Sequence, residues 1–158
     1  MTAAQDQTRK VLFVLGMHRS GTSAATRLVN LLGAELGSNL VTPGPDNPDG
    51  FWEHAEAVSI NEDLLSGLGR TWYDMRDMRE GWLQHEAAER AFSRMTALIQ
   101  ADFEGCSLIA MKDPRMCLTA PLWIKAFQSL GFEVVCLFVV RHPDEVAKSL
   151  HVRNQWAK

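Results

Sequence analysis

Cysteines are few in this sequence and long apolar runs are absent, which excludes several classes of protein. The three cysteines, Cys106, Cys117 and Cys136, show no Cys-x-x-Cys spacing, so a disulfide scaffold and a zinc site are both disfavoured. The longest apolar run, residues 134–140, is too short to span a bilayer. The first ten residues are polar and contain no hydrophobic segment of signal-peptide length. We therefore expect a cytoplasmic protein with no transmembrane segment.

The sequence also lacks an excess of positive charge. It has 16 Lys plus Arg against 19 Asp plus Glu, which gives a net charge of −3. A nucleic acid polymer requires a broad basic surface, so none is expected as a partner. Any anion must then be bound by a local cluster of cations. The length of 158 residues and the 46% of hydrophobic residues fit one globular domain. We expect a flexible tail over residues 1–9 and a single domain over residues 10–158.

Short apolar segments alternate with helical patterns along the chain. The expected strands are Val11–Leu15, Ser107–Met111 and Val134–Val140; all are expected to be buried, and the third is the most apolar. The expected helices are Thr22–Leu32, which should be buried, Glu53–Leu65, His85–Phe103, residues 118–130, and one that Pro143 opens. Residues 33–50 are rich in glycine and proline and predict a long loop, whereas residues 66–83 give no clear pattern. The sequence therefore predicts an α/β fold of three layers, a P-loop-like parallel sheet with helices on both faces.

Cations follow all three predicted strands. In an open parallel sheet, ligands bind beyond the carboxyl ends of the strands, so these side chains should gather at one edge. In chain order the charged residues and histidines after the strands are His18 and Arg19, then Lys112, Asp113 and Arg115, then Arg141 and His142. An acidic chain that collects positive charge at this edge indicates an anionic ligand. The alternative is three separate ion pairs at the surface.

The segment Gly16–Ser23 has the spacing of a phosphate-binding loop. Two glycines with four residues between them lead from a strand to a helix, where backbone N–H groups can point at an anion. The motif of nucleotide hydrolases requires lysine where this sequence has Thr22, and the nearest cation is Arg19. The alternative is a glycine-rich turn that only caps the helix.

Two segments together resemble the sulfotransferase family, in its bacterial and carbohydrate-modifying branches. They are Arg19-Ser20-Gly21-Thr22-Ser23 after the first strand, and Arg141-His142-Pro143 with Ser149 after the third. The resemblance covers the chain from its first strand to its end. It implies 3′-phosphoadenosine 5′-phosphosulfate as the donor, with adenosine 3′,5′-bisphosphate as product and no metal required. The residues it implies for the 5′-phosphosulfate are Arg19, Ser20, Gly21, Thr22 and Ser23, with His18 beside them, and those for the 3′-phosphate are Arg141 and Ser149.

Sulfuryl transfer depends on positioning and charge stabilisation more than on covalent chemistry from the protein. We expect Arg19 to neutralise the charge that grows on the bridging oxygen, because a guanidinium is always charged. A general base must deprotonate the acceptor. Glu53 is the predicted base, since it is expected to start a helix that the preceding loop aims into the cleft. His54 and His18 are alternatives, and Glu53 could instead only favour its helix N-terminus.

No pattern in the sequence identifies the acceptor. The family implies a hydroxyl or amine of a small molecule, a lipid or a carbohydrate. Lys112 and Arg115 could contact either the donor or the acceptor, with Asp113 orienting the arginines. Three tryptophans, Trp52, Trp72 and Trp82, could line an acceptor pocket, although core packing is the usual role of such residues.

The chain is shorter than family members, which usually continue past the 3′-phosphate segment. We therefore expect a domain without the C-terminal helices of the family, either as a fragment or as a natural short form. Two other functions stay open. One is a P-loop nucleotide kinase or hydrolase, because Leu108–Asp113 resembles an apolar strand that ends in a metal-holding aspartate. The other is a truncated, non-catalytic nucleotide-binding protein. The sulfotransferase assignment requires the first and the last of these turns to share one groove.

Overall fold

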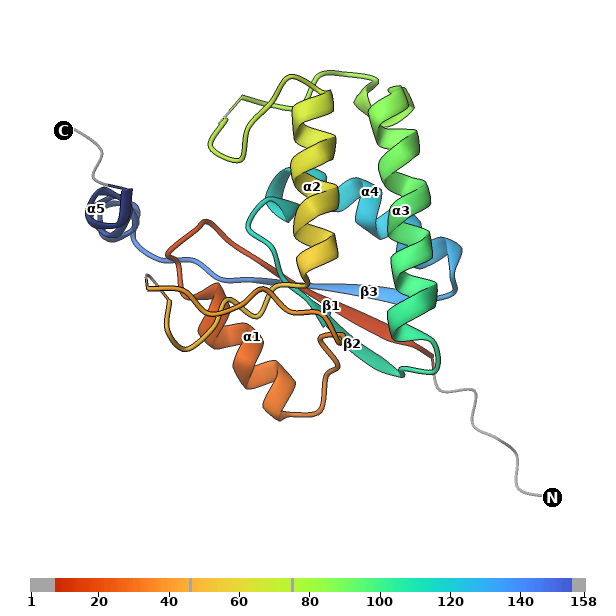
Figure 1. Ribbon diagram of the computed structural model, residues 1–158, viewed down its shortest axis with the longest axis horizontal. Helices are drawn as coiled ribbons and strands as arrows, with labels where there is room; N and C mark the ends of the chain where they lie inside the picture. Colours follow the sequence, from red (N-terminus) through yellow and green to blue (C-terminus); the bar gives the residue numbers. More distant parts are fainter. Residues whose placement is uncertain (1–7, 46, 75, 155–158) are drawn as a thin grey trace.

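The computed structural model describes residues 8–45, 47–74 and 76–154 of the chain. Residues 1–7 of the expected tail lie outside the described residues. The elements in chain order are β1 (Lys10–Leu15), α1 (Thr22–Leu31), α2 (Ala55–Gly67), the 3-10 helix η1 (Trp82–Gln84), α3 (Glu86–Phe103), β2 (Leu108–Met111), α4 (Met116–Ser129), β3 (Glu133–Phe138) and α5 (Pro143–Asn154). Figure 1 shows the sheet at the centre, with α5 set apart at one end. All three predicted strands and all five predicted helices form, with ends shifted by a few residues.

The three strands form one parallel sheet in the order β2-β1-β3. Val11 of β1 lies in register between Ile109 of β2 and Val134 of β3. The α/β class and the parallel sheet are therefore confirmed. Because the strands are parallel, their carboxyl ends lie at the same edge, and the segments that follow them meet there.

The main core lies on the face of the sheet that α2, α3 and α4 cover (Figure 1). Alternate residues of β1, among them Val11 and Phe13, point into it and are fully buried. Phe13 meets Phe127 of α4 edge to face, with ring centroids 5.6 Å apart. Helix α3 packs beside α2 and α4 and buries a stripe of alanines and larger apolar residues. The amphipathic pattern predicted for this helix is thus confirmed, and it places the helix at the side of the core.

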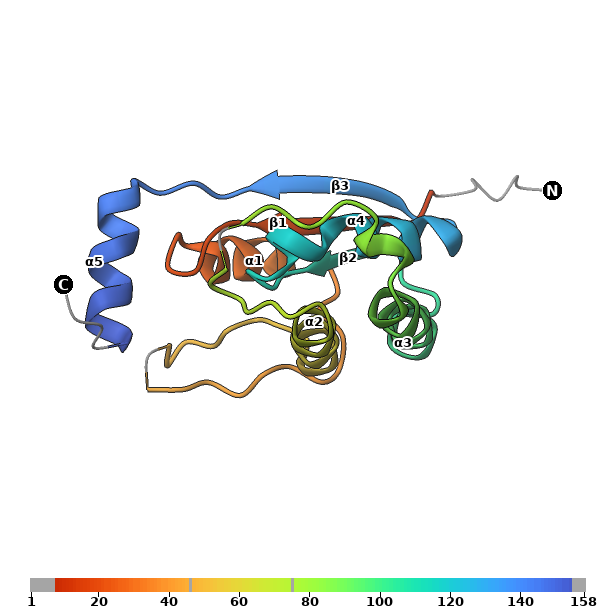
Figure 2. The same ribbon diagram turned by 90° about the horizontal axis from the view of Figure 1, so that it is seen from above.

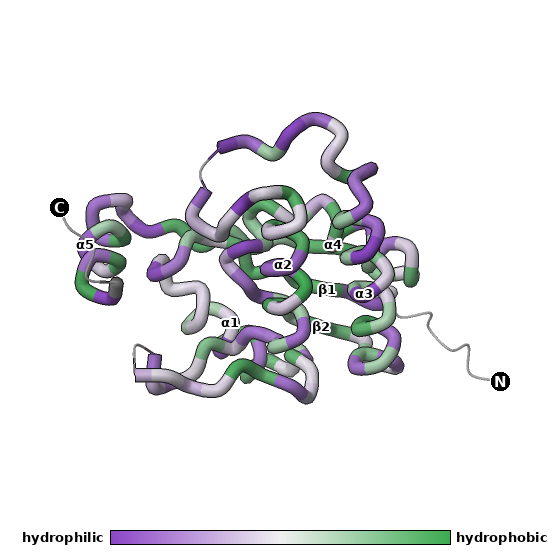
Figure 3. The backbone as a smooth tube through the Cα atoms, turned by 45° about the horizontal axis from the view of Figure 1, so that its top comes forward, coloured by the Kyte–Doolittle hydropathy of each residue, from purple (hydrophilic) through white to green (hydrophobic). Residues whose placement is uncertain are grey.

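A second, smaller apolar cluster lies on the opposite face of the sheet, on the side of α1. Its buried members are Ala34, Leu36 and Ala110. Helices therefore flank both faces, but they cover them unequally. Figure 3 shows β1 and β2 as hydrophobic segments in the middle of the molecule, with hydrophilic loops around them.

Two expectations about burial are wrong. Helix α1 was expected to be buried, yet it buries only Thr22 and Thr26 and exposes Leu28 and Leu31. Strand β3 has the most apolar sequence, but it is an edge strand, as Figure 2 shows, and Phe138 is 70% exposed. An apolar run predicts that a strand can be buried on both faces, and only the pairing order decides which strand takes the central place.

Some boundaries also differ from the sequence prediction. Helix α2 begins at Ala55, so Glu53 lies before the helix and does not start it. Arg9, predicted to belong to the tail, donates a hydrogen bond from Nη2 to the Phe103 carbonyl oxygen at 3.1 Å and lies over the ring of Phe132. In the described part of the chain, no helix has the length and the apolar character needed to cross a membrane.

Asn61 of α2 joins the main core to the segment after β2. It is fully buried. Its Nδ2 donates to Oδ2 of Asp113 at 2.8 Å, and its Oδ1 accepts from Thr119 Oγ1 at 2.8 Å and from Trp123 Nε1 at 2.9 Å. One side chain thus satisfies three buried polar groups, which would otherwise lose hydrogen bonds to water without compensation.

We expect Asn61→Ala to lower the free energy of unfolding by about 2–4 kcal/mol, because it leaves buried donors and an acceptor without partners. Urea unfolding followed by far-UV circular dichroism measures this change. Asn30→Ala is the matched control, since Asn30 is only partly buried; its Nδ2 donates to the Ala34 carbonyl oxygen and its Oδ1 accepts from Arg27 Nη1. Equal effects of the two variants would contradict the role given to Asn61.

Candidate functional site

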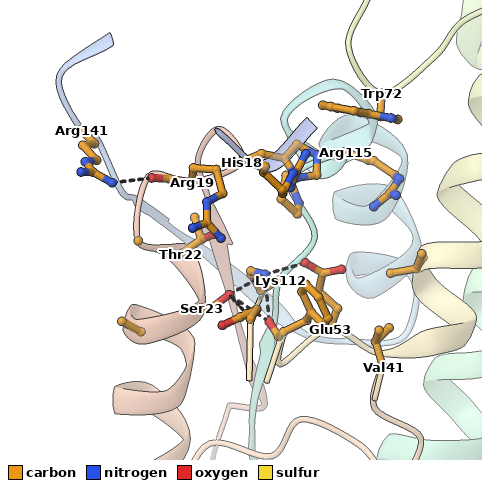
Figure 4. Close-up of a pocket in the computed structure, with 17 residues that line it drawn as sticks. His18, Arg19, Thr22, Ser23, Val41, Glu53, Trp72, Lys112, Arg115 and Arg141 are labelled. Atoms are coloured by element: carbon orange, nitrogen blue, oxygen red, sulfur yellow. Dashed lines mark hydrogen bonds and ion pairs between the residues drawn. The ribbon is translucent and has the colours of Figure 1, made fainter. Parts of the chain in front are cut away.

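A cleft of about 530 Å³ lies beyond the carboxyl ends of the strands (Figure 4). Each strand is followed by residues that line it. The charged and aromatic residues among its lining are His18, Arg19, Phe51, Glu53, Trp72, Lys112, Arg115, Arg141 and Arg153. The gathering of cations that the sequence predicted at this edge is therefore present.

The loop after β1 closes tightly on itself and on the segment after β3. A Cβ atom at Gly16 would lie 2.5 Å from the carbonyl oxygen of Val139, so only glycine fits there. Ser20 Oγ donates to the carbonyl oxygen of Met17 at 2.6 Å. Gly21 has a φ of +99° and leads directly into α1. The first N–H groups of a helix lack intrahelical partners, and this loop brings those of α1 to the cleft.

The first and the last of the cationic turns meet. Arg19 Nε donates to Ser149 Oγ of α5 at 2.8 Å, and Arg141 Nη1 donates to the carbonyl oxygen of Arg19 at 3.2 Å. Figure 4 shows Arg141 and Arg19 side by side at one end of the cleft. Val146 and Leu150 of α5 are buried, and the hydrogen bond between Ser149 and Arg19 joins this helix to the loop. The two turns therefore share one groove.

Most of the predicted donor-binding residues line this cleft, namely His18, Arg19, Gly21, Thr22, Ser23 and Arg141. Two do not belong to its lining. Ser20 is buried in the loop, where its hydroxyl bonds Met17. Ser149 lies behind the guanidinium of Arg19 and reaches the cleft through it.

Glu53 and Lys112 form a buried ion pair on the floor of the cleft. Lys112 Nζ lies 2.5 Å from Glu53 Oε1, and it also donates to the Phe51 carbonyl oxygen at 2.9 Å and to Ser23 Oγ at 3.2 Å. Burial raises the pKa of Glu53, while the positive charge of Lys112 opposes that rise. The ammonium thus connects the predicted base to the phosphate-loop helix. The sequence left the role of Lys112 open, because only the fold brings β2 beside the loop.

Of the alternative bases, His54 lies outside the cleft lining. Its Nε2 is 2.8 Å from Oδ2 of Asp102, whose other oxygen accepts from Ser38 Oγ at 2.6 Å. The ring of His54 packs near that of Phe103. His54 therefore belongs to a contact between the loop and α3, and the geometry favours Glu53 over it as the base.

His18 lines the cleft, but in a form unsuited to proton abstraction. Its ring meets that of Trp72 edge to face, with centroids 4.5 Å apart, and its buried Nε2 has no hydrogen-bond partner among the described residues. Burial lowers the pKa of His18 to about 3, and the charges of Arg115, Arg153 and Lys112 add to the effect. A base of such low pKa stays neutral at physiological pH and accepts protons weakly.

Asp113 holds Arg115 in the cleft wall. Its Oδ1 accepts from Arg115 Nη1 at 2.8 Å, its Oδ2 accepts from Asn61, and only 1% of its surface is exposed. Glu62 Oε1 accepts from Arg115 Nε at 2.6 Å. Both oxygens of Asp113 are thus occupied by protein donors, which fits an orienting role better than metal binding. In the described ranges, no group of three or more His, Cys, Asp or Glu residues is placed to hold a metal ion.

One of the three candidate tryptophans reaches the cleft. Trp72 lines it, whereas Trp52 packs against the smaller apolar cluster and Trp82 against the main core. Arg153 lines the cleft as well and was not predicted from the sequence. The sequence did contain a pattern that could have predicted it: Arg153 comes four residues after Ser149 and therefore lies on the same face of α5.

The fold and the cleft define an α/β protein with a parallel sheet and a cationic cleft at the carboxyl edge of that sheet. Comparisons with known proteins found no matching family model, no similar curated protein and no similar solved structure.

Proposed function

We propose that the protein is a sulfotransferase, which moves a sulfuryl group from 3′-phosphoadenosine 5′-phosphosulfate to a hydroxyl or amine acceptor. The observation that supports this most is the contact between the loop after β1 and the segment after β3, through Arg19, Arg141 and Ser149. A donor with anionic groups at both ends requires two cationic segments in one groove, and these two lie in one groove.

The residues fit such a donor. Gly21, Thr22 and Ser23, where the loop enters α1, line the cleft, and the N-terminus of this helix adds its positive end. In the proposal, Arg19 and residues 20–23 hold the 5′-phosphosulfate. Arg141 holds the 3′-phosphate, and Ser149 supports this end of the cleft through its hydrogen bond with Arg19.

The reaction breaks one bond and forms one bond. The acceptor oxygen or nitrogen bonds to sulfur as the bond between sulfur and the bridging phosphate oxygen breaks, and adenosine 3′,5′-bisphosphate leaves. Glu53 takes the proton of the acceptor, and burial, which raises its pKa, makes its carboxylate a stronger base. Arg19 stabilises the negative charge on the departing oxygen. Lys112 keeps Glu53 beside Ser23 of the loop.

A nucleotide kinase or hydrolase is the alternative that one observation favours. Lys112 brings an ammonium to Ser23 from β2, and so supplies the cation that the loop lacks at Thr22. Against this alternative, both oxygens of Asp113 are engaged by Arg115 and Asn61. A non-catalytic protein would bind the donor without forming any sulfated product.

Calorimetry with adenosine 3′,5′-bisphosphate tests the proposal. We expect the wild type to bind, and Arg141→Ala to weaken binding by about tenfold or more, since a charge-assisted contact to phosphate is lost. Arg90→Ala is the matched control, because Arg90 on α3 also pairs with a glutamate four residues away and lies outside the cleft. Tighter binding of Mg-ATP than of the bisphosphate, or equal affinity of Arg141→Ala and wild type, would show the assignment to be wrong.

A further inference from the structure

Two groups of cations line the cleft, and the proposed donor accounts for one of them. Arg19 and Arg141 lie together at one end. Arg115 lies on the other side with His18 and Trp72, as Figure 4 shows. Arg153 joins this second group, because its guanidinium carbon lies 5.7 Å from the centre of the Trp72 ring. We call the part of the cleft lined by His18, Trp72, Arg115 and Arg153 its Trp72 end.

His18 points to a ligand at the Trp72 end. Its Nε2 is buried and has no hydrogen-bond partner among the described residues. Leaving a buried polar nitrogen in this state is unfavourable, and a bound hydrogen-bond acceptor would remove that cost. The ring is neutral at physiological pH, because burial and the charges of Arg115, Arg153 and Lys112 lower its pKa. A neutral imidazole can donate from Nε2 to an oxygen atom of a ligand.

The charges around this nitrogen favour an anionic ligand. Among its described lining, the cleft has five Lys or Arg side chains and one carboxylate, Glu53, which Lys112 already binds. Arg115 is held by Asp113 and Glu62, neither of which lines the cleft, so its carboxylate partners contact it from outside the ligand space. A neutral ligand at this place would desolvate the cations without offering them a counter-charge.

We propose that the Trp72 end binds an anionic group of the acceptor, so that the substrates are hydroxyl compounds that also bear a carboxylate, a phosphate ester or a sulfate ester. This inference rests on the proposed function for the identity of the acceptor. Ser149 and Arg153 are four residues apart on one face of α5, which separates them by roughly 6 Å along the helix axis. The donor site at Arg19, which Ser149 contacts, and the acceptor anion at Arg153 would therefore be neighbours along the same helix.

Calorimetry with matched pairs of small phenols tests the inference. The pairs are 4-hydroxybenzoate, 4-hydroxyphenylacetate and N-acetyltyrosine, each against its methyl ester, on the free protein and on protein saturated with adenosine 3′,5′-bisphosphate. We expect at least one acid to bind about tenfold more tightly than its ester, and Arg153→Gln to remove most of that difference. Lys148→Gln, also on α5 but outside the cleft, should leave it unchanged.

Two further binding measurements distinguish an anionic group of the acceptor from the sulfuryl group of the donor. Arg153→Gln should bind the bisphosphate product and the intact sulfuryl donor as well as the wild type does. A loss of affinity for the intact donor alone would mean that the Trp72 end holds the donor's sulfuryl group, and would overturn the inference. The inference is also overturned if the acid and the ester bind with equal affinity in every pair, whether that affinity is weak or strong. Failure of the wild type to bind the bisphosphate overturns the proposed function instead.

Discussion

Replacing Arg19 by alanine is expected to lower the rate of sulfuryl transfer by about 10²–10³-fold, the usual loss when one preorganised group that stabilises transition-state charge is removed. Two hydrogen bonds, one from its side chain and one to its backbone, hold Arg19 in position for this role. Its Nε bonds Ser149 Oγ, and its carbonyl oxygen accepts from Arg141. Its φ of +68° is left-handed, and any residue with a Cβ atom is strained there to a similar degree. Alanine therefore removes the guanidinium while the backbone contact to Arg141 remains.

The measurement is kcat with a saturating donor, next to the affinity for adenosine 3′,5′-bisphosphate. Arg19→Lys is the informative companion, because it keeps the charge and loses the planar fork. We expect it to recover part of the rate. Arg27→Ala serves as the control. Arg27 lies on α1, the helix that follows the loop of Arg19, but its guanidinium stacks on Trp52 and does not line the cleft. A rate within a few-fold of wild type for Arg19→Ala would remove Arg19 from the mechanism.

Glu53→Gln is expected to lower kcat by about 10²–10⁴-fold, because a general base contributes on that scale. The pH profile carries a second signature. Burial raises the pKa of Glu53, so the carboxylate becomes able to accept a proton only above the usual range of a glutamate. Activity of the wild type should rise with pH through this raised value, and that limb of the profile should be lost in Glu53→Gln.

The ion pair between Glu53 and Lys112 makes a control for folding necessary with this variant. Glutamine can still accept a hydrogen bond from Lys112 Nζ, but the buried ammonium loses its counter-charge, which destabilises the fold. Far-UV circular dichroism and bisphosphate affinity must therefore be measured on the same sample. Asp102→Asn is the matched control, because Asp102 also pairs with a buried side chain, His54, but outside the cleft. Full activity of a folded Glu53→Gln would exclude Glu53 as the base.

A backbone feature explains how Glu53 reaches its place without being part of α2. Trp52 has a φ of +58°, a left-handed conformation that is uncommon outside glycine. Its side chain packs on the smaller apolar cluster and under the guanidinium of Arg27. This packing holds the chain in the turn that directs the next residue, Glu53, towards Lys112.

The sequence by itself determined the elements and the edge of the sheet at which the cations gather. Apolar runs of strand length and the 3.6-residue period of residues 86–103 are local patterns, so β1 and α3 could be predicted with nearly their observed bounds. The positions of Arg19 and Arg141 at the carboxyl edge followed from the parallel sheet alone, since each lies in the segment that follows its strand. The glycine spacing from Gly16 to Gly21 likewise predicted a closed loop before α1.

Only the tertiary structure decided which of these residues meet and which strand is buried. The pairing order β2-β1-β3 puts the most apolar strand, β3, at the edge, because hydropathy shows that a strand can be buried and not where it pairs. The same long-range packing brings Lys112 to Glu53, which is 59 residues away in the sequence, and Arg153 to Trp72. Such contacts depend on the relative placement of whole elements, and no local period or spacing encodes that placement.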